Sequence, residues 1–394
     1  MTLREQFLRH VGQTSPAPLM IEVDRAEGVF FYSPDGRRYY DLIAGVGVNN
    51  VGHGNAAVVG AVQRQAAEYM HVMVYGETVE RPQVRYAERI AGLLPKGLDS
   101  VYFLNSGSEA VEGALKLAKR ATGRTELISM RGSYHGSTQG SMSVMGGEEY
   151  RRAFRPLLPD TRLLDYNDFD ALRHITARTA AVIAEPVQSE GGVRLPAPGY
   201  PEALRERCTE VGAMLIFDEI QTAFGRTGTM FGLEVSGVVP DIVCLAKAFG
   251  GGMPLGGFVA SRETMGLLSS DPPLGHITTF GGHPVCCAAG LAALEYTLEH
   301  DLAARAEPIG ALYESLLSPH RAVQEIRRAG ALMAIELGSS EKMLAAVQGM
   351  LARGVLSDWF LFCDTAFRIS PPLTITDEQV RDSAEIIAEV LDEL

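Results

Sequence analysis

Five short, continuously apolar runs, with helix-like segments between several of them, constrain the fold of this chain more than any other feature. The runs cover residues 127–130, 180–184, 214–217, 242–246 and 258–260, and residues 200–211 form one of the intervening helix-like segments. Strands buried on both faces are apolar at every position, and intervening helices return the chain for parallel pairing. The sequence therefore predicts an α/β fold with a mostly parallel sheet covered by helices on both faces.

The two ends of the chain have a different pattern. Residues 28–42 contain two aromatic-rich runs around a Pro34-Asp35-Gly36 turn, which predicts a hairpin. After residue 286 the chain continues with amphipathic helices, a strand at 332–337 and a last helix that begins with a capping box, Thr376 with Gln379. We expect an N-terminal segment (1–50) that joins a small C-terminal domain (291–394), and a large domain (51–290) between them.

Charge and cysteine content indicate the class of protein. The 35 basic and 48 acidic residues give a net charge of −13, and no basic run offers a footprint for nucleic acid. The five cysteines show no C-x-x-C spacing, the first residues lack an apolar leader, and no stretch is apolar enough to span a membrane. We expect a soluble cytoplasmic protein that binds neither nucleic acid nor membrane.

Lys247 is one of only five lysines, the other thirty basic residues being arginines. It follows the apolar run 242–246 and precedes three consecutive glycines, so an amine is expected at the end of a buried strand. Burial lowers the pKa of a lysine and frees its amine to form a Schiff base with a carbonyl. The alternative is a strand-end lysine whose amine extends to solvent.

Asp218 ends another apolar run, 214–217. A buried carboxylate needs a partner, and a protonated ring nitrogen of a cofactor is a good one. Glu219 should point to the opposite side of the strand, which argues against an acid/base pair of the two. A metal- or ribose-binding strand end, or a structural role, stays open for this residue.

Two loops could hold other parts of a cofactor. In NSGSEA, Gly107 and Ser108 open a helix, whose free N–H groups and positive dipole end suit a phosphate. Tyr134, in a Gly/Ser-rich loop, could stack on a flat ring or instead pack on the core. No P-loop motif and no histidine spacing typical of a metal site occurs, so we expect no metal.

An anion seat, a stacking aromatic, an acid and an amine are together the parts that hold pyridoxal 5′-phosphate. The chain also resembles the class III (subgroup II) aminotransferases of pyridoxal-phosphate fold type I. The resemblance covers nearly the whole chain and rests on GVGVNNVGHGN, NSGSEA, YHGST, EPVQSEGG, FDEIQTAFGRTG, LAKAFGGGMPLGG, TTFGGHPVCCAA and RISPPL, in that order. It implies an aspartate aminotransferase-like fold, with seven strands in the large domain and a smaller α+β domain.

The resemblance also implies roles for residues around the cofactor. Lys247 would bind the cofactor aldehyde and shuttle the proton, and Asp218 would pair with the pyridine nitrogen. Gln221 would lie near the phenolic oxygen, and Tyr134 would stack on the ring. Gly107 and Ser108 would hold the phosphate, and Thr279 would reach it from the neighbouring subunit, which makes a homodimer the active unit.

Substrate contacts follow from the same resemblance. Glu185 and Glu190 match glutamates of the substrate pocket, and Arg368 matches the arginine that binds a substrate carboxylate. Glu190 would mask Arg368 in one half-reaction and release it in the other, which favours the acetylornithine, ornithine and 4-aminobutyrate branch. A surface ion pair for Arg368 and a solvated Glu190 are the alternatives. Ser137 stands where that branch usually has an arginine, which argues against acetylornithine itself as the donor.

The sequence thus predicts a transaminase with ping-pong kinetics that moves an amino group from an ω-amino donor to a 2-oxo acid, 2-oxoglutarate. An aminomutase of the glutamate-1-semialdehyde type, an epimerase or a lyase on the same fold is the alternative within this cofactor class. A non-catalytic α/β binding protein is the alternative outside it.

Overall fold

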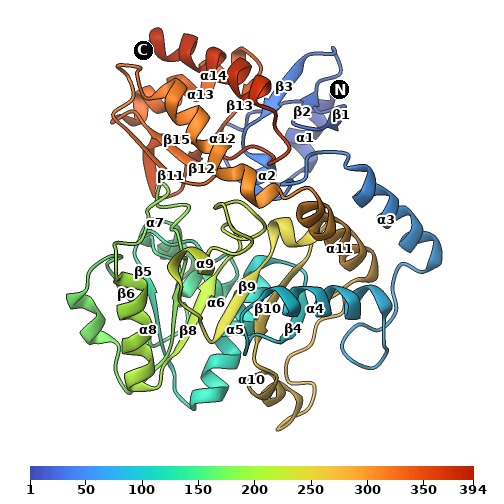
Figure 1. Cartoon of the computed structure of the whole chain (residues 1–394), viewed down its shortest axis with the longest axis vertical. Coiled ribbons are helices and arrows are strands. Elements are labelled where there is room, and N and C mark those ends of the chain that lie inside the picture. The colour runs from blue at the N-terminus through green and yellow to red at the C-terminus, as the bar shows by residue number, and fades with distance from the viewer.

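The computed structural model describes residues 1–394, and a seven-stranded sheet forms its largest layer (Figure 1). The strands, in spatial order, are β4 (Ser100–Leu104), β10 (Gly256–Ala260), β9 (Ile242–Leu245), β8 (Met214–Asp218), β7 (Thr179–Ala184), β5 (Glu126–Met130) and β6 (Thr161–Leu164). Neighbours from β9 to β6 are parallel, and β10 is antiparallel to both of its neighbours. The predicted α/β fold with a mostly parallel sheet is confirmed.

Successive residues of the central strands point to opposite faces of this sheet, and helices cover both faces. On β8, Leu215 and Phe217 pack in a cluster with α4 (Arg81–Leu93), α8 (Tyr200–Val211) and α11 (Pro284–Glu299). Ile216 packs on the other face in a cluster with α5 (Gly107–Thr122). Each buried side chain of this kind contributes roughly 1.5–3 kcal/mol. Burial on both faces explains why the runs are apolar at every position.

The five apolar runs correspond to β5, β7, β8, β9 and β10, and the two strands that the sequence analysis did not recognise are the edges of the sheet. β4 begins with the half-buried Ser100, and β6 carries the exposed Arg162. An edge strand meets solvent along one side and tolerates polar residues. These two strands therefore lack the continuous apolar pattern of the central ones.

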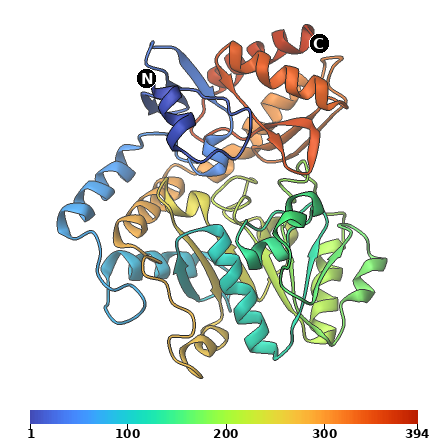
Figure 2. The ribbon, with the colours of Figure 1, turned by 180° about the vertical axis from the view of Figure 1, so that it is seen from behind.

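Two smaller sheets lie at the opposite end of the molecule from the large sheet (Figures 1 and 2). One contains β1 (Arg25–Glu27), β2 (Phe30–Tyr32), β3 (Arg38–Asp41) and β13 (Val355–Leu356); the other contains β11 (Glu325–Ala329), β12 (Leu332–Glu336), β15 (Cys363–Ile369) and β14 (Trp359–Phe360). The predicted hairpin is β2–β3, and β3 pairs in parallel with β13. The N-terminal hairpin therefore joins the C-terminal part of the chain as expected, while the boundaries at 50 and 290 stay a prediction.

The remaining helices connect and cover these sheets. They are α1 (Leu3–His10), α2 (Ala44–Gly47), α3 (Ala56–Glu68), α6 (Gln139–Ser143), α7 (Glu148–Arg151), α9 (Leu233–Ser236), α10 (Arg262–Gly266), α12 (Leu302–Leu317), α13 (Ser340–Ala352) and α14 (Asp377–Asp392), with 3₁₀ turns η1 (Arg152–Phe154), η2 (Asp170–His174), η3 (Lys247–Gly250) and η4 (Leu267–Ser269). The predicted capping box between Thr376 and Gln379 opens α14. None of the helices is both long and apolar enough to cross a membrane.

A buried arginine ties the loop after β8 to the end of the molecule that carries the small sheets. Arg226 donates through Nη1 to the carbonyl oxygens of Pro371 and Ala331, and through Nη2 to Oδ1 of Asn50. Burial lowers the pKa of Arg226 to about 9. Because one guanidinium bonds all three segments, it fixes the position of the small sheets relative to the strand ends that form the site described next.

Candidate active site

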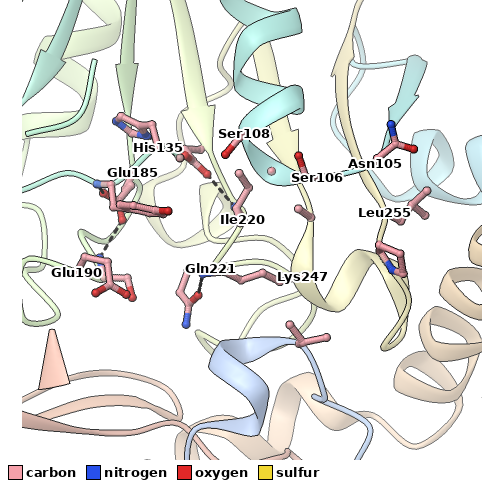
Figure 3. A pocket seen from close by; sticks show the side chains of 18 of the residues that line it. Asn105, Ser106, Ser108, His135, Glu185, Glu190, Ile220, Gln221, Lys247 and Leu255 are labelled. Atoms are coloured by element: carbon pink, nitrogen blue, oxygen red, sulfur yellow. Dashed lines mark hydrogen bonds and ion pairs between the residues drawn. The ribbon is translucent and has the colours of Figure 1, made fainter. Parts of the chain in front are cut away.

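A cavity of about 510 Å³ opens at the carboxyl ends of the central parallel strands (Figure 3). Ligand sites of open α/β sheets form at this edge because the loops that leave the parallel strands converge there. Eight of the residues singled out in the sequence line this cavity: Gly107, Ser108, Tyr134, Glu185, Glu190, Asp218, Gln221 and Lys247. Residues from five separate parts of the chain therefore meet in one place.

Lys247 begins the 3₁₀ turn η3, and Ala246 separates it from the end of β9 at Leu245. Its φ of +53° is unusual for a residue other than glycine, and such strain is typical of functional positions. Nζ donates a hydrogen bond to Oε1 of Gln221, as the dashed line in Figure 3 marks. Burial is the main cause that lowers the pKa of Lys247. The amine thus faces the cavity and does not extend to bulk solvent.

Asp218 and Glu219, adjacent at the end of β8, point to different surroundings, as predicted. Nδ1 of His135 lies 2.7 Å from Oδ2 of Asp218, and both of these side chains are buried beside the cavity. Glu219 instead accepts hydrogen bonds from Thr222 and from the backbone N–H groups of Gly232 and Leu233 at the start of α9. Asp218 alone is therefore available to a ligand in the cavity.

The start of α5 has the geometry expected of the predicted anion seat. Ser106 is the N-cap and accepts from the N–H of Glu109, so the helix begins at Gly107. First-turn N–H groups have no partner within a helix, so those of Gly107 and Ser108 are free for an anion. Gly136 approaches closely: a Cβ there would lie 2.2 Å from Oγ of Ser108, and its φ is +119°. The loop after β5 can cover the seat only with glycine at this position.

Tyr134 and Glu185 form a second side of the cavity. Oε1 of Glu185 accepts from the backbone N–H of Tyr134 at 3.1 Å, and Oε2 accepts from that of Ser189 at 2.9 Å. Burial, with a smaller contribution from Asp218, raises the pKa of Glu185 well above its usual value. The hydroxyl of Tyr134 lies 3.1 Å from that of Ser137. Glu185 thus fixes the backbone at the tyrosine.

Arg368 lies behind Glu190 and is not among the residues that line the cavity. Its Nη2 donates to Oε1 of Glu190 at 2.8 Å, and the arginine side chain is 1% exposed. Burial opposes the charge, but Glu190 and Asp358 outweigh it and raise the pKa of Arg368. The alternatives of a surface ion pair and a solvated glutamate are therefore wrong, since both partners are buried.

Thr279 is the one predicted cofactor residue outside the cavity. It is exposed, on a segment anchored by its neighbour Thr278, whose hydroxyl accepts from Nδ2 of Asn105 at 2.9 Å. Within one chain Thr279 cannot take part in this cavity. Its assignment to a neighbouring subunit stays a prediction.

Three further side chains at the site escaped the sequence analysis. His135 contacts Asp218, Asp358 contacts Arg368, and Ile220 lines the cavity from the turn after β8 (Figure 3). His135 lies next to Tyr134 in the sequence, and this adjacency was the only local signal. Asp358 has no local signal in the sequence, because its contact with Arg368 depends on the pairing of β14 with β15.

The residues of the cavity fit pyridoxal phosphate. An amine, a carboxylate and an anion seat face one space, and no arginine or other lysine lines it. Nε2 of Gln221 is buried and has no hydrogen-bond partner, so it is free to donate to a ligand oxygen. Nε2 of His135 is likewise buried and has no hydrogen-bond partner. A polar ligand would satisfy groups that are otherwise costly to bury.

Comparisons with known proteins agree with this geometry. A family model described as "Aminotransferase class-III" matches residues 11–391. The acetylornithine aminotransferase of Methanopyrus kandleri is 40% identical over 369 residues, covering 93% of this chain and 92% of that protein. The ornithine aminotransferase of Toxoplasma gondii superimposes with a TM-score of 0.91 at 31% identity, covering 100% of this chain and 96% of that one. A second structure of the Toxoplasma enzyme, with partial occupancy of PLP at its active site, has a TM-score of 0.90 at 31% identity, with coverage of 99% and 94%.

Proposed function

Because this chain belongs to the class III aminotransferases, we propose that the donor in its transamination is an ω-amino compound and the acceptor 2-oxoglutarate. The enzyme is a transaminase that depends on pyridoxal phosphate. The relatives named above act, by their names, on acetylornithine and ornithine, which are amines of this kind. One cavity therefore has to accept two different substrates in turn.

The pairing of Glu190 with Arg368 carries this proposal. Lys247, which the cofactor would occupy, is the only lysine or arginine that lines the cavity, so the space presents no other cation while Glu190 covers Arg368. A donor ammonium then enters without meeting a free positive charge. When Glu190 turns away, the guanidinium can bind the carboxylate of a 2-oxo acid through two parallel hydrogen bonds. One rotation of a side chain thus changes which substrate the cavity accepts.

The cofactor would be held by residues from both ends of the cavity. The N–H groups of Gly107 and Ser108 would bind its phosphate, and Gln221 would donate to its phenolic oxygen. Asp218, oriented by His135, would accept a hydrogen bond from its ring nitrogen and keep that nitrogen protonated. Tyr134 would lie against the ring. When bound, pyridoxal phosphate supplies a conjugated system that accepts the electron pair of a broken C–H bond.

Lys247 would move the proton. Burial lowers the pKa of its amine, which favours the neutral form that can act as a general base. Nζ would take the proton from the carbon that bears the donor nitrogen and return it on the cofactor side. The contact with Gln221 holds Nζ at the cavity wall in the free chain. Release from this contact would let the amine reach the substrate carbon.

Ser137 limits the range of amino donors that we expect the enzyme to prefer. It is exposed on the loop that carries Tyr134 and offers a hydroxyl where the branch usually has a guanidinium. A donor carboxylate would lack a charge-assisted anchor there, since an arginine fork binds a carboxylate more strongly than a hydroxyl does. We therefore place donors that do not depend on a carboxylate at this position ahead of acetylornithine.

The active unit in this proposal is a cytoplasmic homodimer. Exposed apolar side chains lie on residues 70–73 and on residues 274–280, the segment that contains Thr279. The two segments meet where the rings of His71 and Phe280 pack with their centroids 4.9 Å apart. A second copy covering this surface would bring Thr279 to its partner's anion seat. The cytoplasmic location rests on the five cysteines, all of which are free thiols.

A donor panel tests the function. Purified holoenzyme is incubated with ω-amino and α-amino donors, with and without 2-oxoglutarate, and glutamate and free oxo product are measured. We expect both products together, only with the acceptor present and in equal amounts. Isomerised donor formed without an acceptor would instead support an aminomutase. No product with any donor, despite bound cofactor, would contradict the proposal.

A further inference from the structure

The guanidinium of Arg368 has a second acidic neighbour. Nε of Arg368 lies 3.1 Å from Oδ1 of Asp358, while Nη2 donates to Oε1 of Glu190 at 2.8 Å. The side chain of Arg368 is 1% exposed, and those of Glu190 and Asp358 are 10% and 28% exposed. One buried cation therefore faces two carboxylates. The proposed exchange of Glu190 for a substrate involves only the first of them and leaves Asp358 without a role.

The two carboxylates occupy different parts of the guanidinium. Nε and Nη2 form one edge to which a carboxylate can bind through both oxygens, and Nη1 and Nη2 form another. Asp358 approaches Nε as an ion pair without a hydrogen bond, since neither Nε nor Oδ1 of Asp358 has a hydrogen-bond partner. Glu190 reaches Arg368 through Nη2, which also donates to the carbonyl oxygen of Trp359 at 3.3 Å. Nη1 is buried and has no hydrogen-bond partner. The second edge is thus half free while Glu190 is in place.

The segment 358–361, which carries Asp358, also contacts both Arg368 and Glu190. The backbone N–H of Arg368 donates to the carbonyl oxygen of Asp358 at 2.8 Å, and the ring of Phe360 lies 4.6 Å from Cζ of Arg368. The N–H of Leu361 donates to Oε2 of Glu190 at 3.1 Å. The position of Asp358 relative to the guanidinium is therefore set by backbone pairing as well as by charge.

Geometry, more than charge, decides what Asp358 does. Its carboxylate repels Glu190 and an incoming substrate carboxylate alike, so this repulsion largely cancels when one replaces the other. Without Asp358, however, Glu190 could bind the free Nε–Nη2 edge through both oxygens, and a bidentate pair is harder to displace than a single contact. Asp358 stands in the way of this second contact, and the N–H of Leu361 holds Oε2 of Glu190 in its present place.

We propose that Asp358 is a positioning residue for acceptor specificity: by occupying the Nε side of Arg368 it confines Glu190 to one contact, so that a substrate carboxylate can take the Nη1–Nη2 edge. This inference rests on the proposed exchange of Glu190 for a substrate carboxylate and identifies the residue that keeps the exchange easy.

Asp358→Ala and Asp358→Asn, compared as holoenzymes, test the proposal. Calorimetry measures the binding of glutarate, a dicarboxylate without a reacting carbonyl, and kinetics compares 2-oxoglutarate with an aliphatic aldehyde acceptor that has no carboxylate. We expect Asp358→Ala to weaken glutarate binding and raise the KM for 2-oxoglutarate about tenfold, the equivalent of one charge-assisted hydrogen bond. The kcat for the aldehyde should stay unchanged. Asp358→Asn should restore glutarate binding, because its amide oxygen fills the same side of Arg368.

Asp364→Asn is the matched control, an exposed carboxylate on β15 whose partner is Ser340. It should bind glutarate like the unchanged enzyme. If a thermal unfolding measurement shows that Asp358→Ala is not folded, Asp358→Ser takes its place, and we expect the same weakening of glutarate binding. Equal glutarate affinity in all variants, tighter binding in both Asp358 variants, or an equal loss with the aldehyde would overturn the proposal. If the unchanged enzyme binds glutarate but transfers no amino group to 2-oxoglutarate, the proposed function fails, while the glutarate comparison still decides the role of Asp358.

Discussion

Nδ1 of His135 lies 2.7 Å from Oδ2 of Asp218, at the end of the strand that carries the aspartate. The side chains are 0% and 3% exposed, so neither can exchange this contact for water. Oδ1 of Asp218 accepts from the N–H of Ile220 at 3.1 Å. The carboxylate is therefore held by both oxygens, and its orientation toward the cavity does not depend on a ligand.

We predict that Asp218→Asn lowers kcat by about a hundredfold or more, because an amide cannot keep the ring nitrogen of the cofactor protonated. His135→Gln should lower kcat less, since it removes the orientation and leaves the charge. Steady-state kinetics of the two single variants and the double variant measure this. The double variant should be no slower than Asp218→Asn, and additive losses would contradict an action of His135 through Asp218.

Lys247→Ala should lower kcat at least about a thousandfold, because it removes the proposed general base. Cofactor binding gives an independent measurement. After borohydride treatment, mass spectrometry should find the cofactor mass on the peptide that contains Lys247 in the unchanged enzyme. The control is Lys342→Ala, a lysine of α13 that is not among the residues lining the cavity. Cofactor attached to any other lysine would contradict the assignment.

Ser137→Arg should raise kcat/KM for acetylornithine about tenfold or more, because a guanidinium adds a charge-assisted anchor for the donor carboxylate. The site is exposed, so the longer side chain fits without displacing the core. Ser137→Gln, similar in reach but uncharged, is the control and should leave the donor preference unchanged. No gain with arginine would show that the donor carboxylate binds elsewhere.

Glu190→Gln should shift the balance between the two substrates. Without the negative charge, Arg368 presents its cation to the cavity and repels a donor ammonium, so kcat/KM for the ω-amino donor should fall about tenfold. The value for 2-oxoglutarate should hold or rise, because a neutral amide competes less for the guanidinium. Separate measurement of each half-reaction by cofactor absorbance checks this. A parallel loss for both substrates would argue for a structural role of Glu190.

Stability should depend on pH through Glu219. Burial is the main cause that raises the pKa of Glu219 from 4.5 to about 7, and the residue is 0% exposed. A carboxyl whose pKa is higher in the folded state stabilises it fully below pH 4.5 and loses this contribution as the pH rises toward 7. The loss amounts to about 3 kcal/mol.

Glu219→Gln imitates the protonated form and escapes this loss. Its melting temperature, measured by differential scanning fluorimetry from pH 5 to pH 8, should therefore improve relative to the unchanged protein as the pH rises. The variant also forfeits part of the hydrogen bonding at the start of α9, so it can be the less stable protein at pH 5. A difference that is independent of pH would contradict the assignment.

The sequence by itself determined the central architecture and most of the cavity. The apolar runs from 127 to 260 predicted strands because burial on both faces demands apolar residues at every position. Since the carboxyl ends of parallel strands share one edge, strand-end residues such as Asp218 and Lys247 were bound to meet. The capping box at Thr376 was readable because it is a contact between neighbours in the chain.

Tertiary structure alone decided the contacts between distant segments. Glu190 meets Arg368 across 178 residues, which the family resemblance implied but no residue pattern near either of them did. Asp358 meets the same guanidinium only because β15 folds back along β14. No local pattern encodes such a pairing, since its partners are chosen by the register of the strands and by the packing beneath them. The edge strands β4 and β6 were missed for a related reason, because half-exposed positions carry no continuous apolar pattern. The sequence therefore determines which chemical groups the cavity contains, and the fold determines which of them touch.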